Sequence, residues 1–181
     1  MSNKNNYISV YIPEKTKEQI KLLQNIIIKS DSKFKPVEYN DLHMTLLFMG
    51  ETFCKKNKTM IKLFYNEINE ILNNNNFNLL FNNPKIEKFP PNKENLVVIT
   101  FNPNKDALLL FKLIYDKIDN GEHVFENWIP HITIGKLRDK NTDLTTVIKD
   151  LFNNLDESFI SNSIYLAGNI KDNYNALKWT F

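Results

Sequence analysis

The chain is poor in cysteine and has no long apolar segment, and both features limit what it can be. Cys54 is the only cysteine among 181 residues, which excludes a disulfide framework and a metal site built from several thiolates. No run of about 18 apolar residues occurs, so the sequence predicts no transmembrane helix. The first residues lack the basic and then apolar order of a secretory signal, and we therefore expect a cytoplasmic protein.

The chain also has little arginine and a small net charge. Arg138 is the only arginine among 23 basic residues, so phosphate binding cannot rest on an arginine cluster. The net charge is +2, with acidic and basic residues interspersed, which argues against a long binding track along duplex nucleic acid. A small phosphorylated ligand or the end of a strand remains compatible with this charge. The frequent asparagine, lysine and isoleucine are typical of an AT-rich genome, such as that of a virus, a protist or a low-GC bacterium.

The sequence contains enough apolar residues, 42% of the chain, for a single domain that spans residues 1–181. Its periodicity predicts an α+β fold, with helices over 17–29, 57–73, 106–120 and 143–153. Thr16 and Gln19 form a capping-box pattern at the start of the first helix. The predicted strands are 8–12, 42–49, 77–81, 86–89, 96–101, 131–137, 159–166 and 176–181. A turn is predicted at 82–84, between the third and fourth of these ranges.

Two His-x-Thr motifs lie within these predicted strands. The first consists of His43 and Thr45, and the second of His131 and Thr133. Because side chains alternate between the two faces of a strand, the histidine and threonine of each motif share a face. A single histidine on a strand is most often a core residue satisfied by a hydrogen bond. A matched pair favours a functional site.

The spacing of the elements repeats around the motifs. Tyr7 lies 36 residues before His43, and Leu96 lies 35 residues before His131. Each pseudo-repeat half, about 1–90 and 91–181, runs strand, helix, His-x-Thr strand, helix, strand. We therefore expect two lobes related by a pseudo-two-fold axis, with the motif strands facing each other across a central cleft. Similar element lengths alone are common in α+β chains, so the phase of the motifs carries this prediction.

Two facing histidines permit general acid–base catalysis at phosphorus. The unperturbed pKa of histidine is about 6.5, so one imidazole can be neutral and the other protonated near neutral pH. Each role contributes a factor of about 10² to 10⁴ to the rate. The threonine hydroxyls can donate hydrogen bonds to the non-bridging phosphate oxygens, which carry charge in the transition state. This chemistry requires no metal and no cofactor, and the histidine spacing indicates no metal site.

The residues around both motifs resemble the 2H phosphoesterases, in particular the RNA 2′,3′-cyclic phosphodiesterase (LigT-like) branch. Residues 42–51 resemble the first signature of that family, and residues 128–135 resemble the second. The resemblance implies a bilobal α+β fold in which each pseudo-symmetric lobe has a mainly antiparallel sheet and outer helices. It also implies metal-independent cleavage of a phosphodiester at a ribose 2′ position. On this resemblance His43 is the general acid and His131 the base, and the roles reverse when a 2′-hydroxyl attacks instead of water.

The chain departs from the LigT-like branch after the second motif. The branch often has an arginine five residues after the second histidine, where this chain has Lys136. Arg138 is the other candidate for a phosphate-binding cation. Strict alternation along the strand points both away from His131, which leaves a solvated surface as the alternative for each. Five aromatic residues complete the predicted substrate site: Tyr7, Tyr11, Phe48, Trp128 and Tyr174. For Phe48 and Trp128, packing in the core is the alternative.

The sequence therefore predicts a phosphodiesterase that acts on a nucleotide or a short RNA as a monomer, without a membrane. The bond can be a 2′,3′-cyclic phosphate, a 2′-5′ linkage or a bond of a cyclic dinucleotide. For a viral chain, the alternative is an immune-evasion nuclease that degrades cyclic GMP-AMP or 2′-5′ oligoadenylate in the host cytosol. A second alternative is a module that binds a nucleotide or an RNA end without turnover.

Overall fold

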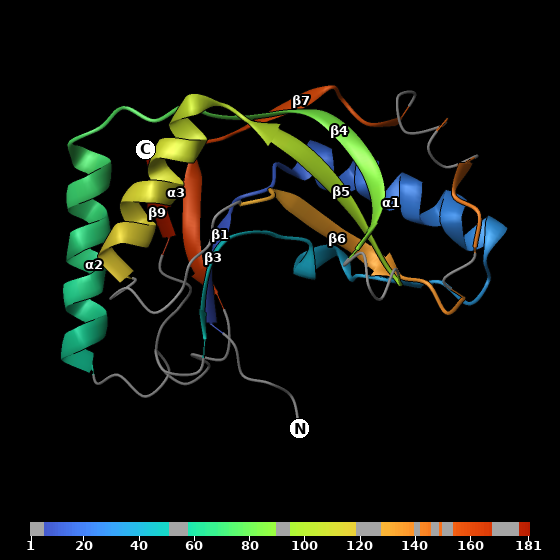
Figure 1. Ribbon diagram of the computed structural model, residues 1–181, viewed down its shortest axis with the longest axis horizontal. Coiled ribbons are helices and arrows are strands. Elements are labelled where there is room, and N and C mark those ends of the chain that lie inside the picture. Colours follow the sequence, from blue (N-terminus) through green and yellow to red (C-terminus); the bar gives the residue numbers. More distant parts are fainter. Residues whose placement is uncertain are drawn as a thin grey trace.

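The computed structural model describes residues 6–50, 58–89, 95–118, 128–139, 142–145, 149, 154–167 and 178–181. These residues form an α+β fold, as the sequence predicted (Figure 1). None of the helices in these ranges is long and apolar enough to cross a membrane. The elements in chain order are β1 (Asn6–Val10), α1 (Glu14–Ser30), β2 (Lys35–Pro36), the 3₁₀ helix η1 (Tyr39–Asp41), β3 (Met44–Gly50), α2 (Lys58–Asn73), β4 (Leu79–Phe89), β5 (Leu96–Pro103), α3 (Lys105–Ile118), β6 (His131–Lys136), β7 (Ser158–Ser161), β8 (Ser163–Ala167) and β9 (Lys178–Thr180).

The nine strands form one strongly curled antiparallel sheet in the order β7-β4-β5-β6-β3-β1-β8-β9, with β2 paired to β6. The pairing of β6 with β3 is limited to one position, where Met44 lies opposite Ile132. The strands on either side of this seam pair over several residues. The sheet therefore consists of two half-sheets, β7-β4-β5-β6 and β3-β1-β8-β9, which are joined only at the seam.

The two half-sheets have matching arrangements. In each, the strand with a His-x-Thr motif lies at the seam, and its neighbour is the first strand of the corresponding sequence half, β1 or β5. The outer strands are exchanged between the sequence halves. β4 of the first half pairs with β5 of the second, whereas β8 and β9 of the second half extend the sheet beyond β1 of the first. The boundary near residue 90 therefore does not coincide with the boundary between the half-sheets.

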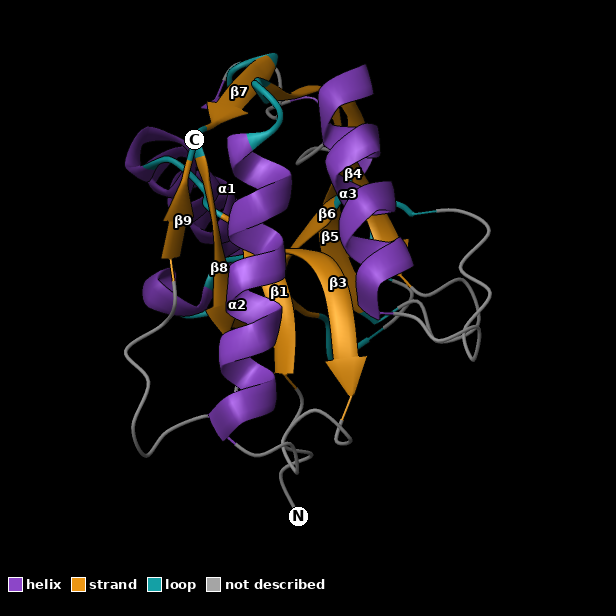
Figure 2. Cartoon of the chain, turned by 90° about the vertical axis from the view of Figure 1, so that its left-hand side faces the viewer, coloured by secondary structure: helices purple, strands orange, loops and turns teal. Residues whose placement is uncertain are grey.

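The helices also cross from one half to the other. α1 follows β1 in the chain but contacts β6, and α3, which follows β5, contacts β3 of the other half-sheet as well as β4 and β5 of its own. α2 packs beside α3 (Figure 2), and its Tyr65 stacks on Trp179 of β9 with 5.3 Å between the ring centroids. Each helix buries an apolar stripe, which in α1 contains Ile20, Leu23 and Ile27. The prediction of helical periodicity in these segments is confirmed.

The start of α1 differs from the prediction. The helix begins at Glu14, directly after Pro13, and no side chain caps it. Thr16 is buried inside the first turn, and the side-chain amide of Gln19 donates a hydrogen bond to Asp156 (3.1 Å). The capping-box prediction was therefore wrong, because proline already fixes a backbone angle that suits the residue before a helix.

Two strand boundaries also differ. The turn predicted at 82–84 is a bulge inside a continuous β4, where Asn83 has the left-handed φ of 52° that asparagine tolerates. The strand predicted at 159–166 is interrupted at Asn162. β7 pairs with β4 and β8 pairs with β1, so the chain passes from one half-sheet to the other at this residue. The helix predicted at 143–153 lies largely outside the described residues.

Candidate active site

The seam brings the two motifs together. Met44 comes directly after His43, and Ile132 comes directly after His131. Met44 and Ile132 lie opposite each other in the sheet. In an antiparallel pair, the residues before one position lie opposite the residues after its partner. Continuing the register by one residue therefore places His43 near Thr133, and Thr45 near His131. The four motif side chains occupy one face of the seam, while Met44 and Ile132 are fully buried on the other.

Both histidines have the same backbone contact. The Nδ1 of His43 lies 2.7 Å from the carbonyl oxygen of Asp41, and the Nδ1 of His131 lies 2.8 Å from that of Ile129. Each carbonyl belongs to the residue two positions earlier. Because a carbonyl oxygen can only accept, Nδ1 carries the proton that is donated. Nε2 of each ring therefore remains for a substrate.

An aromatic ring packs against each half-buried imidazole. Tyr7 stacks on His43 with a centroid distance of 4.7 Å, and Phe89 lies tilted against His131 at 5.0 Å. Tyr7 was predicted to line the site from its place on β1. Phe89 was not among the predicted site residues, because its contact with His131 depends on the pairing of β4, β5 and β6. These rings hold both imidazoles in defined orientations.

Each motif strand contains a bulge three residues after its histidine. In β3, Ser9 lies opposite Thr45 and Ile8 opposite Leu47, so Leu46 is the extra residue. In β6, Val98 lies opposite Thr133 and Val97 opposite Gly135, so Ile134 is the extra residue. A bulge of one residue shifts the alternation of side chains. The residue five positions after each histidine therefore returns to the face of the motif, and these residues are Phe48 and Lys136.

This geometry corrects the expectation for Lys136. Leu96, opposite Lys136, and Thr100, opposite His131, share one face of β5 because an even number of residues separates them. Lys136 therefore lies on the face of His131, and strict alternation was wrong here because Ile134 is bulged. Arg138 lies two residues beyond Lys136, past the end of β6, and is exposed.

The threonines and an aromatic cavity lie beside the histidines. Thr45 and Thr133 are half-buried, and within the described residues neither hydroxyl has a protein hydrogen-bond partner. Phe48 is 45% exposed, which leaves its ring accessible to a base. The cavity has a volume of about 190 Å³ and is lined by Thr45, Leu46, Leu47, Phe48, Phe89, Phe111, Trp128, Ile129 and His131.

Trp128 connects the two motif strands. Its Nε1 donates a hydrogen bond to the carbonyl oxygen of Thr45 (3.1 Å). Its ring stacks on Phe111 at 5.1 Å and meets the edge of Phe81 at 6.2 Å. The packing alternative therefore accounts for most of the contacts of this half-buried residue, which also forms part of the cavity wall.

A second tyrosine, Tyr165, lies near the first motif. Tyr165 of β8 lies opposite Ser9, which lies opposite Thr45, so all three share a face. Burial raises the pKa of the Tyr7 and Tyr165 hydroxyls, so both stay protonated and can donate. Tyr165 was not predicted, because it lies in an apolar strand without a motif.

Tyr11 follows β1 and has ionic neighbours. Its hydroxyl donates to the carboxylate of Glu14 (3.4 Å), and the ammonium groups of Lys17 and Lys178 lie over its ring. The structure thus places Tyr11 in a charged cluster at the end of the site face. Tyr174, His123 and Cys54 lie outside the described residues.

The comparisons with known proteins concern the fold. No family model matches the sequence, and no curated protein matches it either. The solved structure of E. coli LigT in its apo form is similar, with a TM-score of 0.69 and 16% identity over 99% of this chain and 98% of that chain. TT0787 of Thermus thermophilus has a TM-score of 0.65 at 13% identity, over 97% of this chain and 94% of that chain. Usb1 of Kluyveromyces marxianus has a TM-score of 0.56 at 11% identity, over 99% of both chains. The chain therefore has the fold of E. coli LigT, as its resemblance to the LigT-like 2H phosphoesterases predicted.

Proposed function

We propose that the chain is a metal-independent phosphodiesterase that cleaves a nucleotide phosphodiester at a ribose 2′ position. The observation that carries this proposal is the seam pair of Met44 and Ile132, which sets two His-x-Thr motifs against each other on one face. E. coli LigT, which shares the fold, has been crystallised with phosphate and with 3′-AMP, which supports a nucleotide as the ligand. The two histidines, each with Nε2 left for a substrate, support an enzyme over a module that only binds.

In the proposed reaction, a phosphodiester lies between the two imidazoles. Nε2 of His131 takes a proton from a water molecule as its oxygen attacks phosphorus. Nε2 of His43 gives a proton to the ribose oxygen as the bond between that oxygen and phosphorus breaks. The hydroxyls of Thr45 and Thr133 donate to the non-bridging oxygens, which carry the developing charge.

The cavity supports a nucleotide that carries an accessible base. Its walls are mainly apolar and include three phenylalanines and a tryptophan, and the exposed ring of Phe48 offers a stacking surface beside Thr45 and His131. Stacking on an aromatic side chain contributes about 1–3 kcal/mol per base. The substrate panel in the test below therefore contains 2′,3′-cyclic nucleotides, 2′-5′ oligoadenylate and cyclic GMP-AMP isomers.

Histidine replacement tests the proposed function. We expect His43→Ala and His131→Ala each to lower kcat by about 10² to 10⁴ on the preferred substrate. The double variant should be little worse than either single variant, because the two groups act as a unit. His123→Ala is the matched control, since this histidine lies outside both motifs. A folded His43→Ala or His131→Ala variant that retains substantial activity would refute the mechanism, and so would loss of wild-type activity in a metal chelator.

A further inference from the structure

A second concavity, which we call the basic basin, lies beyond the end of β6. Its volume is about 770 Å³. Four of the residues that line it are cationic and none is acidic. Among the described residues, the ion pairs do not include any of these four cations. The lining residues are Ser32, Lys33, Phe34, Lys35, Asn95, Lys136, Leu137 and Arg138.

The pairing of β2 with β6 places two lysines side by side. Lys35 lies directly opposite Lys136, and Pro36 lies opposite Gly135. Opposite residues of an antiparallel pair share a face, and like charges at such positions repel each other. The fold thus holds a repulsive pair without an acidic partner in the basin lining. Binding of an anion would relieve this repulsion.

The position of β2 is built into the fold. A Cβ atom at Gly135 would overlap the ring of Phe34 and lie 2.7 Å from the carbonyl oxygen of Lys35. The glycine therefore lets β2 approach β6 closely. The carbonyl oxygen of the bulged Ile134 accepts hydrogen bonds from the backbone of Val37 (3.0 Å) and from the buried side chain of Gln24 (2.8 Å). These contacts keep the basic basin in place.

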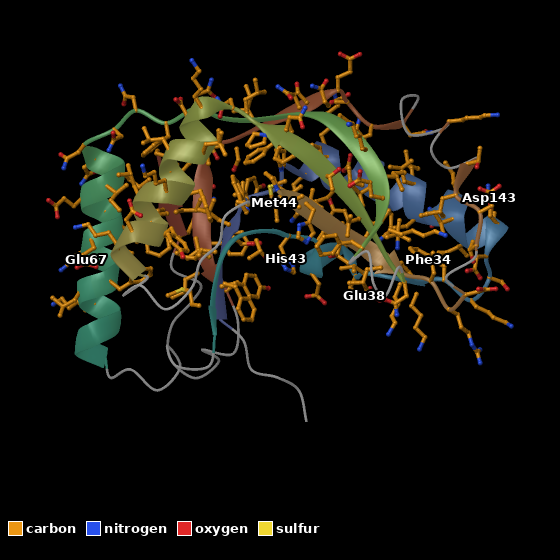
Figure 3. The ribbon with its side chains drawn as sticks, viewed as in Figure 1. Phe34, Glu38, His43, Met44, Glu67 and Asp143 are labelled. Atoms are coloured by element: carbon orange, nitrogen blue, oxygen red, sulfur yellow. The ribbon has the colours of Figure 1, made fainter. Side chains whose placement is uncertain are left out.

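The basic basin continues from the proposed catalytic site along β6. Lys136 lies on the same face as His131, about 13 Å away along the sheet, because their partners Leu96 and Thr100 are four residues apart at about 3.3 Å per residue. Figure 3 shows Phe34, which packs on Gly135 at the basin, well to the right of His43. One phosphate cannot occupy both places. The cations of the basin are therefore placed for a part of the ligand beyond the scissile phosphodiester.

We propose that the basic basin binds further phosphate groups of a single-stranded oligonucleotide whose scissile phosphodiester lies between His43 and His131. This inference rests on the proposed function and narrows its substrate class. Oligonucleotides should be preferred over mononucleotides and cyclic dinucleotides, because only a longer strand carries phosphates at the required distance. The cations act as a positively charged groove beside a base-stacking site, as in other proteins that bind single strands.

The test compares substrates of different length. The substrates are a 2′,3′-cyclic mononucleotide and an RNA of about ten nucleotides with a 5′-hydroxyl and a 2′,3′-cyclic phosphate end. For Lys33→Ala/Lys35→Ala we expect the ratio of kcat/KM for RNA over mononucleotide to fall about tenfold. The slope of log(kcat/KM) for RNA against log[salt] is negative and should become less steep by about 1.4, because each of the two lost phosphate contacts contributes about 0.7 in single strands. The charge-matched control is Lys62→Ala/Lys112→Ala, in exposed positions of α2 and α3 far from the basin.

A binding measurement separates this inference from the proposed function. The His43→Ala/His131→Ala variant is titrated with fluorescent single-stranded RNA, with and without Lys33→Ala/Lys35→Ala, and anisotropy is measured. We expect about tenfold weaker binding without the two lysines. Equal binding, or an equal loss in the Lys62→Ala/Lys112→Ala control, overturns the inference whatever the activity. If the wild-type protein cleaves no substrate but the loss of the two lysines still weakens RNA binding, the role of the basic basin is supported and the proposed function is refuted.

Discussion

At the residue scale, the threonines of the two motifs are the least constrained polar groups of the site. The histidines are held by backbone carbonyls and aromatic rings, and Trp128 holds the carbonyl of Thr45. The hydroxyls of Thr45 and Thr133, in contrast, have no protein partner among the described residues. A half-buried hydroxyl without a partner is expected where a ligand or water completes its hydrogen bonds.

This arrangement predicts the effect of removing each hydroxyl. Thr45→Val and Thr133→Val keep the shape and the β-branched side chain but remove the donor. We expect each to lower kcat by about 10²-fold, because a donor to a developing phosphate charge acts mainly in the transition state. Steady-state kinetics checks this, with unfolding curves as the control for stability. A variant that raises KM and leaves kcat unchanged would show that the hydroxyl serves only ground-state binding.

At the element scale, one buried side chain of α1 controls the bulge of β6. The side-chain amide nitrogen of Gln24 lies 2.8 Å from the carbonyl oxygens of both Ile134 and Val37. Gln24 is fully buried, and its own Oε1 has no partner within the described residues. A helix that follows β1 thus fixes the bulge that turns Lys136 toward the site.

Replacing this side chain should loosen the bulge. We expect Gln24→Met to lower the free energy of unfolding by about 1–3 kcal/mol, because the buried carbonyl of Ile134 and the half-buried carbonyl of Val37 both lose their side-chain donor. Asn25→Met, at an exposed position of the same helix, should change it by about 0.5 kcal/mol or less. Urea denaturation measures both values. Equal stabilities of the two variants would mean that Gln24 contributes nothing specific to the bulge.

Local patterns account for most elements of the fold and for the core of the candidate site. The apolar stripe of α1 and the β-branched runs around His43 and His131 were visible in the sequence, and their positions are confirmed within a few residues. The bulges at Leu46 and Ile134 could not be predicted in this way, because a bulge is defined by the partner strand. The same holds for Tyr165 and Phe89, which reach the site only through pairing with distant strands.

At the scale of the whole molecule, a cluster of surface interactions connects segments that are far apart in the chain. Asp156, just before β7, accepts a hydrogen bond from Gln19 and forms an ion pair with Lys15 (2.7 Å). Lys15 and Gln19 hold the pKa of the Asp156 carboxyl below its ordinary value. The Tyr39 hydroxyl, together with Lys17, lowers the pKa of Glu14 in the same way, and Glu14 in turn raises the pKa of Tyr39 to about 12.

These shifts predict how stability depends on pH. A carboxyl with a lowered pKa stabilises the fold above the unfolded-state pKa, 3.8 for Asp156, and this contribution disappears as the pH falls through the folded pKa. A tyrosine with a raised pKa stabilises the fold below the unfolded value of 10.0, and this contribution disappears as the pH rises through the folded value, about 12 for Tyr39. We therefore expect Tm to be highest between these limits and to fall toward both.

Thermal unfolding from pH 2.5 to 11.5 checks this expectation. Asp156→Asn should reduce the loss of Tm on the acid side and leave the alkaline side unchanged. A Tm that stays constant below pH 4, or an Asp156→Asn variant with the acid dependence of the wild type, would contradict the assignment.

The exchange of outer strands between the two half-sheets has a consequence for synthesis on the ribosome. β1 is made long before its neighbour β8, because β2 to β7 and the helices α1 to α3 lie between them in the chain. Until β8 emerges, one edge of β1 has no partner, and unpaired edges promote aggregation. Truncated products that end before residue 163 are therefore expected to depend on chaperones or to be degraded, whereas products that include β8 cover this edge of β1.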